Sequence, residues 1–130
     1  MSKPTRLKGP GARHISPGLQ APALTRTAVL NALGPLVYAA STRDGLVKIG
    51  FTAHLAQRVG EFGGMRAILA IRLGCTMSDE QAIHSALNAN PANVARGIEW
   101  YHPTDEVLDV VNTMRADIGM PPIDCGDIAD

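Results

Sequence analysis

Cysteine is scarce in this chain of 130 residues, and its two copies, Cys75 and Cys125, stand far apart. Neither belongs to a CxxC pair or to a Cys/His cluster, so a disulfide framework and a structural zinc site both lack support. Long apolar runs are missing as well. No stretch approaches the roughly 18 apolar residues that cross a bilayer, and the N-terminus has no apolar run of a secretion signal. We therefore expect a cytoplasmic, intracellular protein without a membrane segment.

Net charge is absent too, because 12 basic side chains balance 12 acidic ones. The balance hides an uneven distribution. Residues 1–30 carry five basic residues and no acid, whereas residues 104–130 carry seven acids against Arg115 alone. A basic, Pro/Gly-rich head can hold polyanions loosely or can simply keep the chain soluble, and the acidic end would repel DNA.

The pattern along the chain predicts three parts. Prolines and glycines interrupt residues 1–24 so often that neither a helix nor a strand ladder can form, which predicts a disordered basic arm. A hydrophobic content of 45% over this length supports one modest core, and we place that domain at residues 25–116. Residues 117–130 are rich in aspartate and predict a frayed acidic C-terminal tail.

The domain is expected to have an α/β (α+β) fold, with a small three-stranded antiparallel sheet flanked by helices. The strands are expected at three apolar stretches, residues 36–41, 46–51 and 67–73. The last stretch is apolar almost throughout, which is typical of a central strand. Residues 97–101 are expected to form a short extended piece.

Helical spacing of apolar residues predicts four helices, at residues 25–33, 53–62, 78–88 and 105–116. Ser78 and Gln81 have the spacing of a capping box for the third helix, and Thr104 is the expected N-cap of the last. The apolar face of that last helix consists of Val107, Leu108, Val111 and Met114.

Short motifs lie at particular points of this pattern. Leu36-Val37-Tyr38 stands on the first strand, Lys48-Ile49-Gly50 stands on the second, and Arg58 follows on the next helix. A later helix carries Glu80 and, four residues on, His84, and the segment 97–101 reads Gly-Ile-Glu-Trp-Tyr. In this order and spacing, residues 36–112 resemble the GIY-YIG nuclease superfamily, and most closely its KIG branch, which is common in phage and mobile-element proteins.

The resemblance implies a metal-dependent endonuclease, a hydrolase that cuts DNA phosphodiester bonds. It implies that Tyr38 is the general base that deprotonates water and that Arg58 holds the scissile phosphate with its forked guanidinium. It also implies that Glu80 binds Mg²⁺ or Mn²⁺ through its carboxylate. A phenol has a pKa of about 10, so we expect nearby cations, Lys48 first among them, to lower the pKa of Tyr38 by roughly 2 to 3 units.

Two histidines are further candidates for substrate binding. His84 shares a helix face with Glu80 and could orient substrate, ligate metal or be structural. His54 lies one turn before Arg58 and could touch a phosphate, although this contact is the weaker expectation. Glu99 and Trp100 are expected to close the domain, Trp100 by packing.

The turn between the two motif strands decides whether Tyr38 and Lys48 can meet. A two-residue loop, Asp44-Gly45, would place them on opposite faces of the sheet. A three-residue loop, Arg43-Asp44-Gly45 with a left-handed Gly45, would place Tyr38 opposite Gly50 and Lys48 on the same face. The nuclease hypothesis therefore predicts the three-residue loop.

Two other functions stay open. The first motif keeps only its tyrosine and the net charge is zero, which favours a catalytically weakened or inactive GIY-YIG-like module that binds nucleic acid or regulates. The acidic tail is also compatible with a protein-interaction domain. If the chain does cut DNA, a domain this small needs help in choosing a sequence, from the basic arm, from a homodimer or from a partner protein.

Overall fold

The computed structural model describes residues 23–61 and 65–129. The expected disordered arm, residues 1–24, therefore lies outside the described residues except for its last two. Leu24, one of these two, donates its backbone N–H to the carbonyl of Ile68 at 2.8 Å, so the described chain begins against the sheet.

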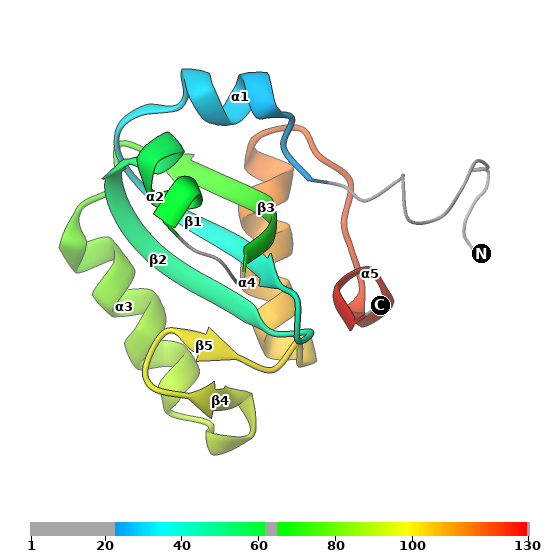
Figure 1. Ribbon diagram of the computed structural model, residues 1–130. Helices are drawn as coiled ribbons and strands as arrows, with labels where there is room; N and C mark the ends of the chain where they lie inside the picture. The colour runs from blue at the N-terminus through cyan, green and yellow to red at the C-terminus, as the bar shows by residue number, and fades with distance from the viewer. Residues whose placement is uncertain (1–22, 62–64, 130) are drawn as a thin grey trace.

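The fold is mixed α/β, with one five-stranded antiparallel sheet in the order β3-β1-β2-β5-β4 (Figure 1). The strands are β1 (Leu33–Thr42), β2 (Val47–His54), β3 (Met65–Leu73), β4 (Val94–Arg96) and β5 (Trp100–Tyr101). The expected number of three strands is therefore inexact. The three long strands are present, but β4 and β5 are too short to show the alternation that identifies a strand in a sequence.

The third long strand, β3, lies at an edge of the sheet and not in its centre, as its apolar sequence had suggested. The central position among the three long strands belongs to β1. The apolar character of β3 has a different cause, since helices cover both faces of the sheet and bury side chains on each side of the strand.

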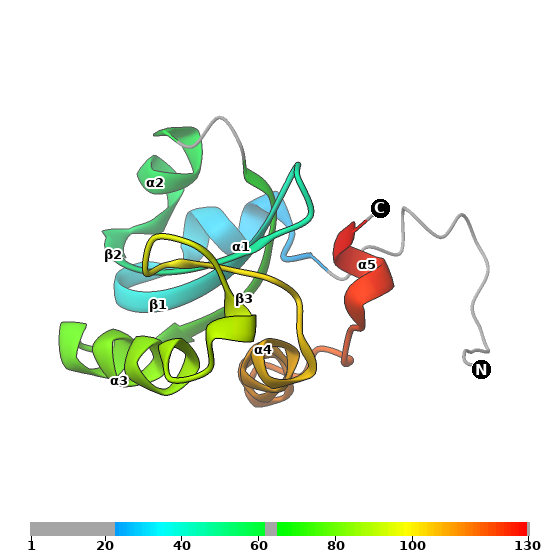
Figure 2. The ribbon, with the colours of Figure 1, turned by 90° about the horizontal axis from the view of Figure 1, so that it is seen from below.

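Helices pack on the two faces of the sheet, with α3 and α4 on one and α1 and α2 on the other (Figure 2). Their bounds are α1 (Arg26–Asn31), α2 (Leu55–Glu61), α3 (Met77–Asn88), α4 (Asp105–Asp117) and α5 (Cys125–Ala129), with a 3₁₀ turn at Pro91–Asn93. Among the described residues, no helix is long and apolar enough to cross a membrane.

Side chains of β1 are buried on both faces from Leu36 to Thr42, because successive residues point to opposite sides. Val37 and Ala39 join the larger core under α3 and α4. Tyr38 points to the other side, into a smaller core with Leu55 of α2. Strand alternation therefore explains why Tyr38 is buried in the smaller core and not under α3 and α4.

The N-cap of helix α3 lies two residues earlier than expected, and its capping box consists of Thr76 and Asp79, not Ser78 and Gln81. The Thr76 hydroxyl accepts the Asp79 N–H at 3.3 Å, and the Asp79 carboxylate accepts the Thr76 N–H at 2.7 Å. These two reciprocal hydrogen bonds make Thr76 the N-cap of the helix. As a result, Glu80 lies on the buried side of the first turn.

The helix α4 has the expected N-cap at Thr104, and its four expected core residues are all buried. The expected frayed tail is wrong for residues 118–129. Ile123 and Ile128 of this segment are 6% and 1% exposed and belong to the larger core. Asn112 holds Ile123 in place, accepting its N–H and donating to its carbonyl, both at 2.9 Å.

A buried cation, Arg115, joins this C-terminal segment to the sheet. The register between β1 and β3 shifts between Ala39 and Ala40, which leaves Leu69 as the extra residue of a bulge. The Arg115 guanidinium donates to the Leu69 carbonyl and to the Pro121 carbonyl, each at 2.7 Å. Burial lowers the pKa of Arg115 to about 10, so the side chain stays charged at neutral pH.

Replacing Arg115 with methionine tests this connection. Arg115→Met keeps much of the volume but leaves the Leu69 and Pro121 carbonyls without their donor. We expect the free energy of unfolding, measured by urea denaturation, to fall by roughly 2 to 4 kcal/mol. The matched control is Arg72→Ala, which removes an exposed ion pair with Asp117 and should cost less than about 1 kcal/mol. Equal losses in the two variants would contradict the account.

Candidate functional site

The loop between β1 and β2 has three residues, Arg43-Asp44-Gly45. Thr42 pairs with Leu46 through its N–H, which donates to the Leu46 carbonyl at 2.9 Å, and Gly45 adopts a left-handed conformation with φ of 81°. This is the longer of the two loops that the sequence left open. The register that it sets places Tyr38 opposite Gly50, as the nuclease hypothesis predicted.

The Tyr38 side chain crosses directly over Gly50. A Cβ atom added at Gly50 would lie 2.7 Å from the Tyr38 hydroxyl oxygen and 2.8 Å from Cζ, so no other residue fits there without displacing the ring. Tyr38 itself is only 1% exposed. The glycine of the KIG motif is therefore the residue that allows the tyrosine to lie across the neighbouring strand.

Lys48 lies on the same face of the sheet as Tyr38, and its Nζ is 5.8 Å from the centre of the Tyr38 ring. The ammonium is almost fully buried and forms an ion pair of 2.6 Å with Glu99. Lys48 pairs with Trp100 in the register of β2 and β5, and its Nζ lies 5.0 Å from the centre of the Trp100 ring. Buried charge of this kind is stable only when paired.

Glu99 reaches Lys48 because of the two short strands that the sequence did not reveal. Its carbonyl accepts the Ile49 N–H at 3.0 Å, which fixes the backbone of Glu99 beside the edge of β2. Sequence reasoning gave Glu99 only a role in closing the domain. Nothing within a two-residue strand indicates its partner, so the pairing that brings Glu99 to Lys48 could not be read from the residues.

Arg58 of α2 and Glu80 of α3 both act on the pKa of Tyr38. Burial raises the pKa of Tyr38 to about 12, Arg58 lowers it, and Glu99 and Glu80 raise it further. The expected depression of the Tyr38 pKa is therefore wrong for the protein without metal. Arg58 acts in the expected direction, but the loss of hydration around a buried phenol outweighs one half-buried guanidinium.

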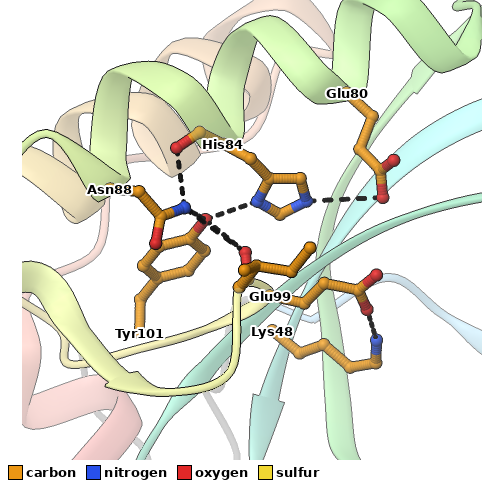
Figure 3. Close-up of polar contacts among 7 residues, drawn as sticks. Lys48, Glu80, His84, Asn88, Glu99 and Tyr101 are labelled. Carbon is orange, nitrogen blue, oxygen red and sulfur yellow. Dashed lines mark hydrogen bonds and ion pairs between the residues drawn. The ribbon is translucent and has the colours of Figure 1, made fainter.

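A hydrogen-bonded group on α3 continues the site (Figure 3). His84 Nε2 lies 3.3 Å from a carboxylate oxygen of Glu80, and the other ring nitrogen of His84 contacts the Tyr101 hydroxyl. The Asn88 amide donates to this hydroxyl at 3.1 Å and to the His84 carbonyl at 2.7 Å. The sequence gave no role to Asn88 or Tyr101, and only the i, i+4 spacing of Asn88 from His84 could have suggested one.

Glu80, His84 and Glu99 each offer one ligand atom, and these three atoms lie within 4.8 Å of one another. These three residues could therefore hold a metal ion. Glu80 and His84 are buried and Glu99 is partly exposed, so the group is open on the Glu99 side. A nitrogen and two carboxylates are a plausible donor set for a divalent cation, and one of its members, the buried Nε2 of His84, has no hydrogen-bond partner among the described residues.

His54 is not part of this arrangement. It is exposed at the end of β2, and among the described residues no hydrogen bond or ion pair joins its side chain to the other candidates. Trp100 is half-buried between two cations, with Arg96 at 4.7 Å from its ring centre and Lys48 on it as well, which agrees with the expected packing role.

Comparisons of the chain with protein-family models, with curated proteins and with solved structures find no match. The structure brings together Tyr38, Lys48, Arg58, Glu80 and His84, adds Glu99, and leaves His54 apart.

Gly50→Ala tests the crossing of Tyr38 over β2. The new methyl group would collide with a buried side chain, so we expect a loss of roughly 1 to 3 kcal/mol in the free energy of unfolding. Gly60→Ala is the control, because no atom lies within 4 Å of a Cβ built at this glycine of α2. That change should be neutral or slightly stabilising. An unchanged free energy of unfolding in Gly50→Ala would contradict the position of the Tyr38 ring over Gly50.

The two tyrosines of the chain give a second test. Tyr38 and Tyr101 both have a pKa raised to about 12, mainly by burial. In the presence of a chelator, the ultraviolet absorbance of phenolate should stay low through pH 10 in the folded protein and rise near pH 12. The unfolded chain loses these protons at lower pH than the folded protein does. The free energy of unfolding should therefore fall as the pH rises from about 10 to about 12. A native titration near pH 10 would contradict the burial of both rings.

Proposed function

We propose that the protein is a metal-dependent endonuclease of the GIY-YIG type that hydrolyses DNA phosphodiester bonds. One observation carries the proposal: the hairpin register lays Tyr38 across Gly50, within electrostatic reach of Arg58, Glu80 and Glu99. These groups come from four separate elements of the chain. Phosphodiester hydrolysis needs a base, a cation for the phosphate and help for the leaving oxygen, and a phenol, a guanidinium and metal-binding carboxylates could supply these.

Glu80 and its neighbours His84 and Glu99 would hold the divalent cation. A divalent cation such as Mg²⁺ or Mn²⁺, when bound there, supplies positive charge for the phosphate oxygens and the leaving 3′ oxygen. The buried and unpaired Nε2 of His84 and the two nearby carboxylates fit such an ion. This chain's own residues carry the remaining tasks of binding, orientation and proton movement.

Arg58 binds the scissile phosphate in this proposal. Its guanidinium lies on the side of the sheet that carries Tyr38, and it is half-buried on α2, so its planar fork is partly shielded from water. A fork of N–H donors matches two phosphate oxygens at once, which orients the phosphorus for attack. Lys48 keeps a second positive charge on the same face.

Tyr38 positions the attacking water and, once its own proton has passed to solvent and it is a phenolate, accepts the proton of that water. With a pKa of about 12, the phenol is neutral in the protein alone and its oxygen can still hold a water molecule by hydrogen bonding. Glu80 and Glu99 both raise this pKa. Neutralisation of the two carboxylates would remove their contribution and leave Arg58 to favour the phenolate, so proton transfer depends on the loaded site.

A second candidate function is a nucleic-acid-binding or regulatory module with weak or no catalysis. The observation that favours it is the 2.6 Å ion pair between Lys48 and Glu99, which already neutralises a cation on the same face of the sheet as Tyr38. In either case, DNA is the proposed partner. Sequence choice would depend on the basic arm, on a homodimer or on a partner protein.

Plasmid cleavage tests the proposal. We expect the wild-type protein to nick or linearise supercoiled plasmid with Mg²⁺ or Mn²⁺ and to lose this activity with a chelator. Tyr38→Phe, Arg58→Ala and Glu80→Ala should each lower the cleavage rate by about 100-fold or more, because each removes a separate catalytic task. Arg72→Ala removes an exposed arginine on β3 and should cleave at the wild-type rate.

Three results would overturn the proposed activity or its site. Absence of cleavage by the wild type, with a salt-dependent gel shift, would favour the binding module. Absence of both cleavage and shift would leave a protein-interaction domain. Equal cleavage by all variants would mean that the activity arises elsewhere.

A further inference from the structure

The proton of the Tyr101 hydroxyl has a fixed place. The hydroxyl oxygen lies 2.8 Å from the carbonyl oxygen of Ile98, and only the hydroxyl can donate between these two atoms. The proton must therefore lie on the line to Ile98. The two lone pairs of Tyr101 remain as acceptors for any other group.

Two donors use these lone pairs. The Asn88 amide nitrogen lies 2.7 Å from the His84 carbonyl, which can only accept, so the nitrogen of Asn88 is correctly oriented and it donates to Tyr101 at 3.1 Å. The remaining contact joins Tyr101 to Nδ1 of His84. Because the tyrosine proton is already used, His84 must donate through Nδ1–H. A neutral His84 therefore carries no proton on Nε2.

The bare Nε2 of His84 points at a carboxylate. It lies 3.3 Å from Glu80 Oε2, it is buried, and it has no hydrogen-bond partner among the described residues. The His84 and Glu80 side chains are each 9% exposed. Two acceptors that face each other away from water repel, unless a proton or a metal ion lies between them.

Glu99 adds a third donor on the open side of the pair. One carboxylate oxygen of Glu99 lies within 4.8 Å of the ligand atoms of Glu80 and His84. The ion pair with Lys48 uses Oε1, so the other oxygen of Glu99 can serve a second cation. The backbone of Glu99 is fixed by its hydrogen bond to Ile49, which keeps this carboxylate near α3.

We propose that Glu80, His84 and Glu99 form a three-ligand site for a first-row transition-metal dication, Zn²⁺, Co²⁺ or Mn²⁺, in preference to Mg²⁺. An imidazole nitrogen favours these ions, whereas Mg²⁺ prefers oxygen ligands in a near-ideal octahedron. Three protein ligands leave positions open for water or phosphate. The inference deepens the proposed function by naming the metal class of its site, but metal binding itself does not require cleavage.

Tyr101 and Asn88 act as positioning residues for this site. A histidine that binds metal ordinarily donates its other ring N–H to an acceptor, which fixes the ring and its tautomer. Tyr101 is that acceptor, and Asn88 and the Ile98 carbonyl hold the hydroxyl in the accepting orientation. The arrangement has the form of a prepared ligand and its support.

Cobalt binding tests the site without DNA. The full chain is stripped of metal and titrated with Co²⁺ alone, and the visible d–d absorption of bound Co²⁺ is recorded. We expect saturation at one equivalent, displacement by Zn²⁺, and no displacement by a large excess of Mg²⁺. The spectrum reports a nitrogen and oxygen ligand field directly.

Variants assign the ligands. His84→Gln and Glu99→Gln should each weaken Co²⁺ binding by at least tenfold, and Tyr101→Phe by about 10- to 100-fold, since it removes the acceptor for Nδ1–H. His102→Gln is the matched control, because His102 is exposed on the loop after β5, and it should bind as the wild type does. Circular dichroism checks the fold of each variant, above all that of Glu99→Gln, because this change removes the negative charge that pairs with the buried Lys48 ammonium.

Each outcome decides the inference. Three results would overturn it: no one-to-one Co²⁺ complex, ready displacement of Co²⁺ by Mg²⁺, or unchanged Co²⁺ binding in folded His84→Gln and Glu99→Gln. The first of these would mean that a proton alone joins His84 to Glu80. Co²⁺ binding lost in these variants, without plasmid cleavage by the wild type, would support the metal site and reject the nuclease. Cleavage of plasmid with Mg²⁺ at the wild-type rate in His84→Gln would support the nuclease and reject the three-ligand metal site.

Discussion

The passage of the Tyr38 ring over Gly50 is the contact on which the proposed site depends. It needs a three-residue loop with Gly45 in the left-handed region, and it needs a residue without a side chain at position 50. A two-residue loop would place Tyr38 and Lys48 on opposite faces of the sheet, and a side chain at position 50 would displace the Tyr38 ring. Strand alternation then fixes Lys48 on the same face, so one backbone register determines the relative placement of two buried polar groups.

Burial and the neighbouring charges together set the protonation state of Tyr38. The tyrosine is neutral because it is buried and because Glu80 and Glu99 raise its pKa, whereas Arg58 favours its ionised form. The same two carboxylates flank the unpaired nitrogen of His84. A cation held by these three residues would satisfy the nitrogen and would also ease ionisation of the phenol, which links the proposed metal site to the proposed proton transfer.

Local patterns predicted the long elements and the hairpin, because alternation, helical spacing and capping residues act over a few neighbours. They failed where distant segments meet. The strands β4 and β5 have no periodicity to detect, so the pairing of Lys48 with Glu99 was missed, and the apolar run of β3 indicated burial but not position in the sheet. The C-terminal segment looked frayed from its aspartates, yet Ile123 and Ile128 anchor it.

The central claim is that Tyr38, Arg58, Glu80 and His84 form one phosphate- and metal-binding site. A crystal structure of the protein with Mn²⁺ and a short DNA duplex tests it most directly, through the anomalous signal of manganese. The account predicts one Mn²⁺ ligated by Glu80 and His84, with a DNA phosphate between the metal and Arg58 and the Tyr38 hydroxyl facing that phosphate. Manganese bound away from Glu80, or DNA bound on a surface remote from Tyr38, would contradict it.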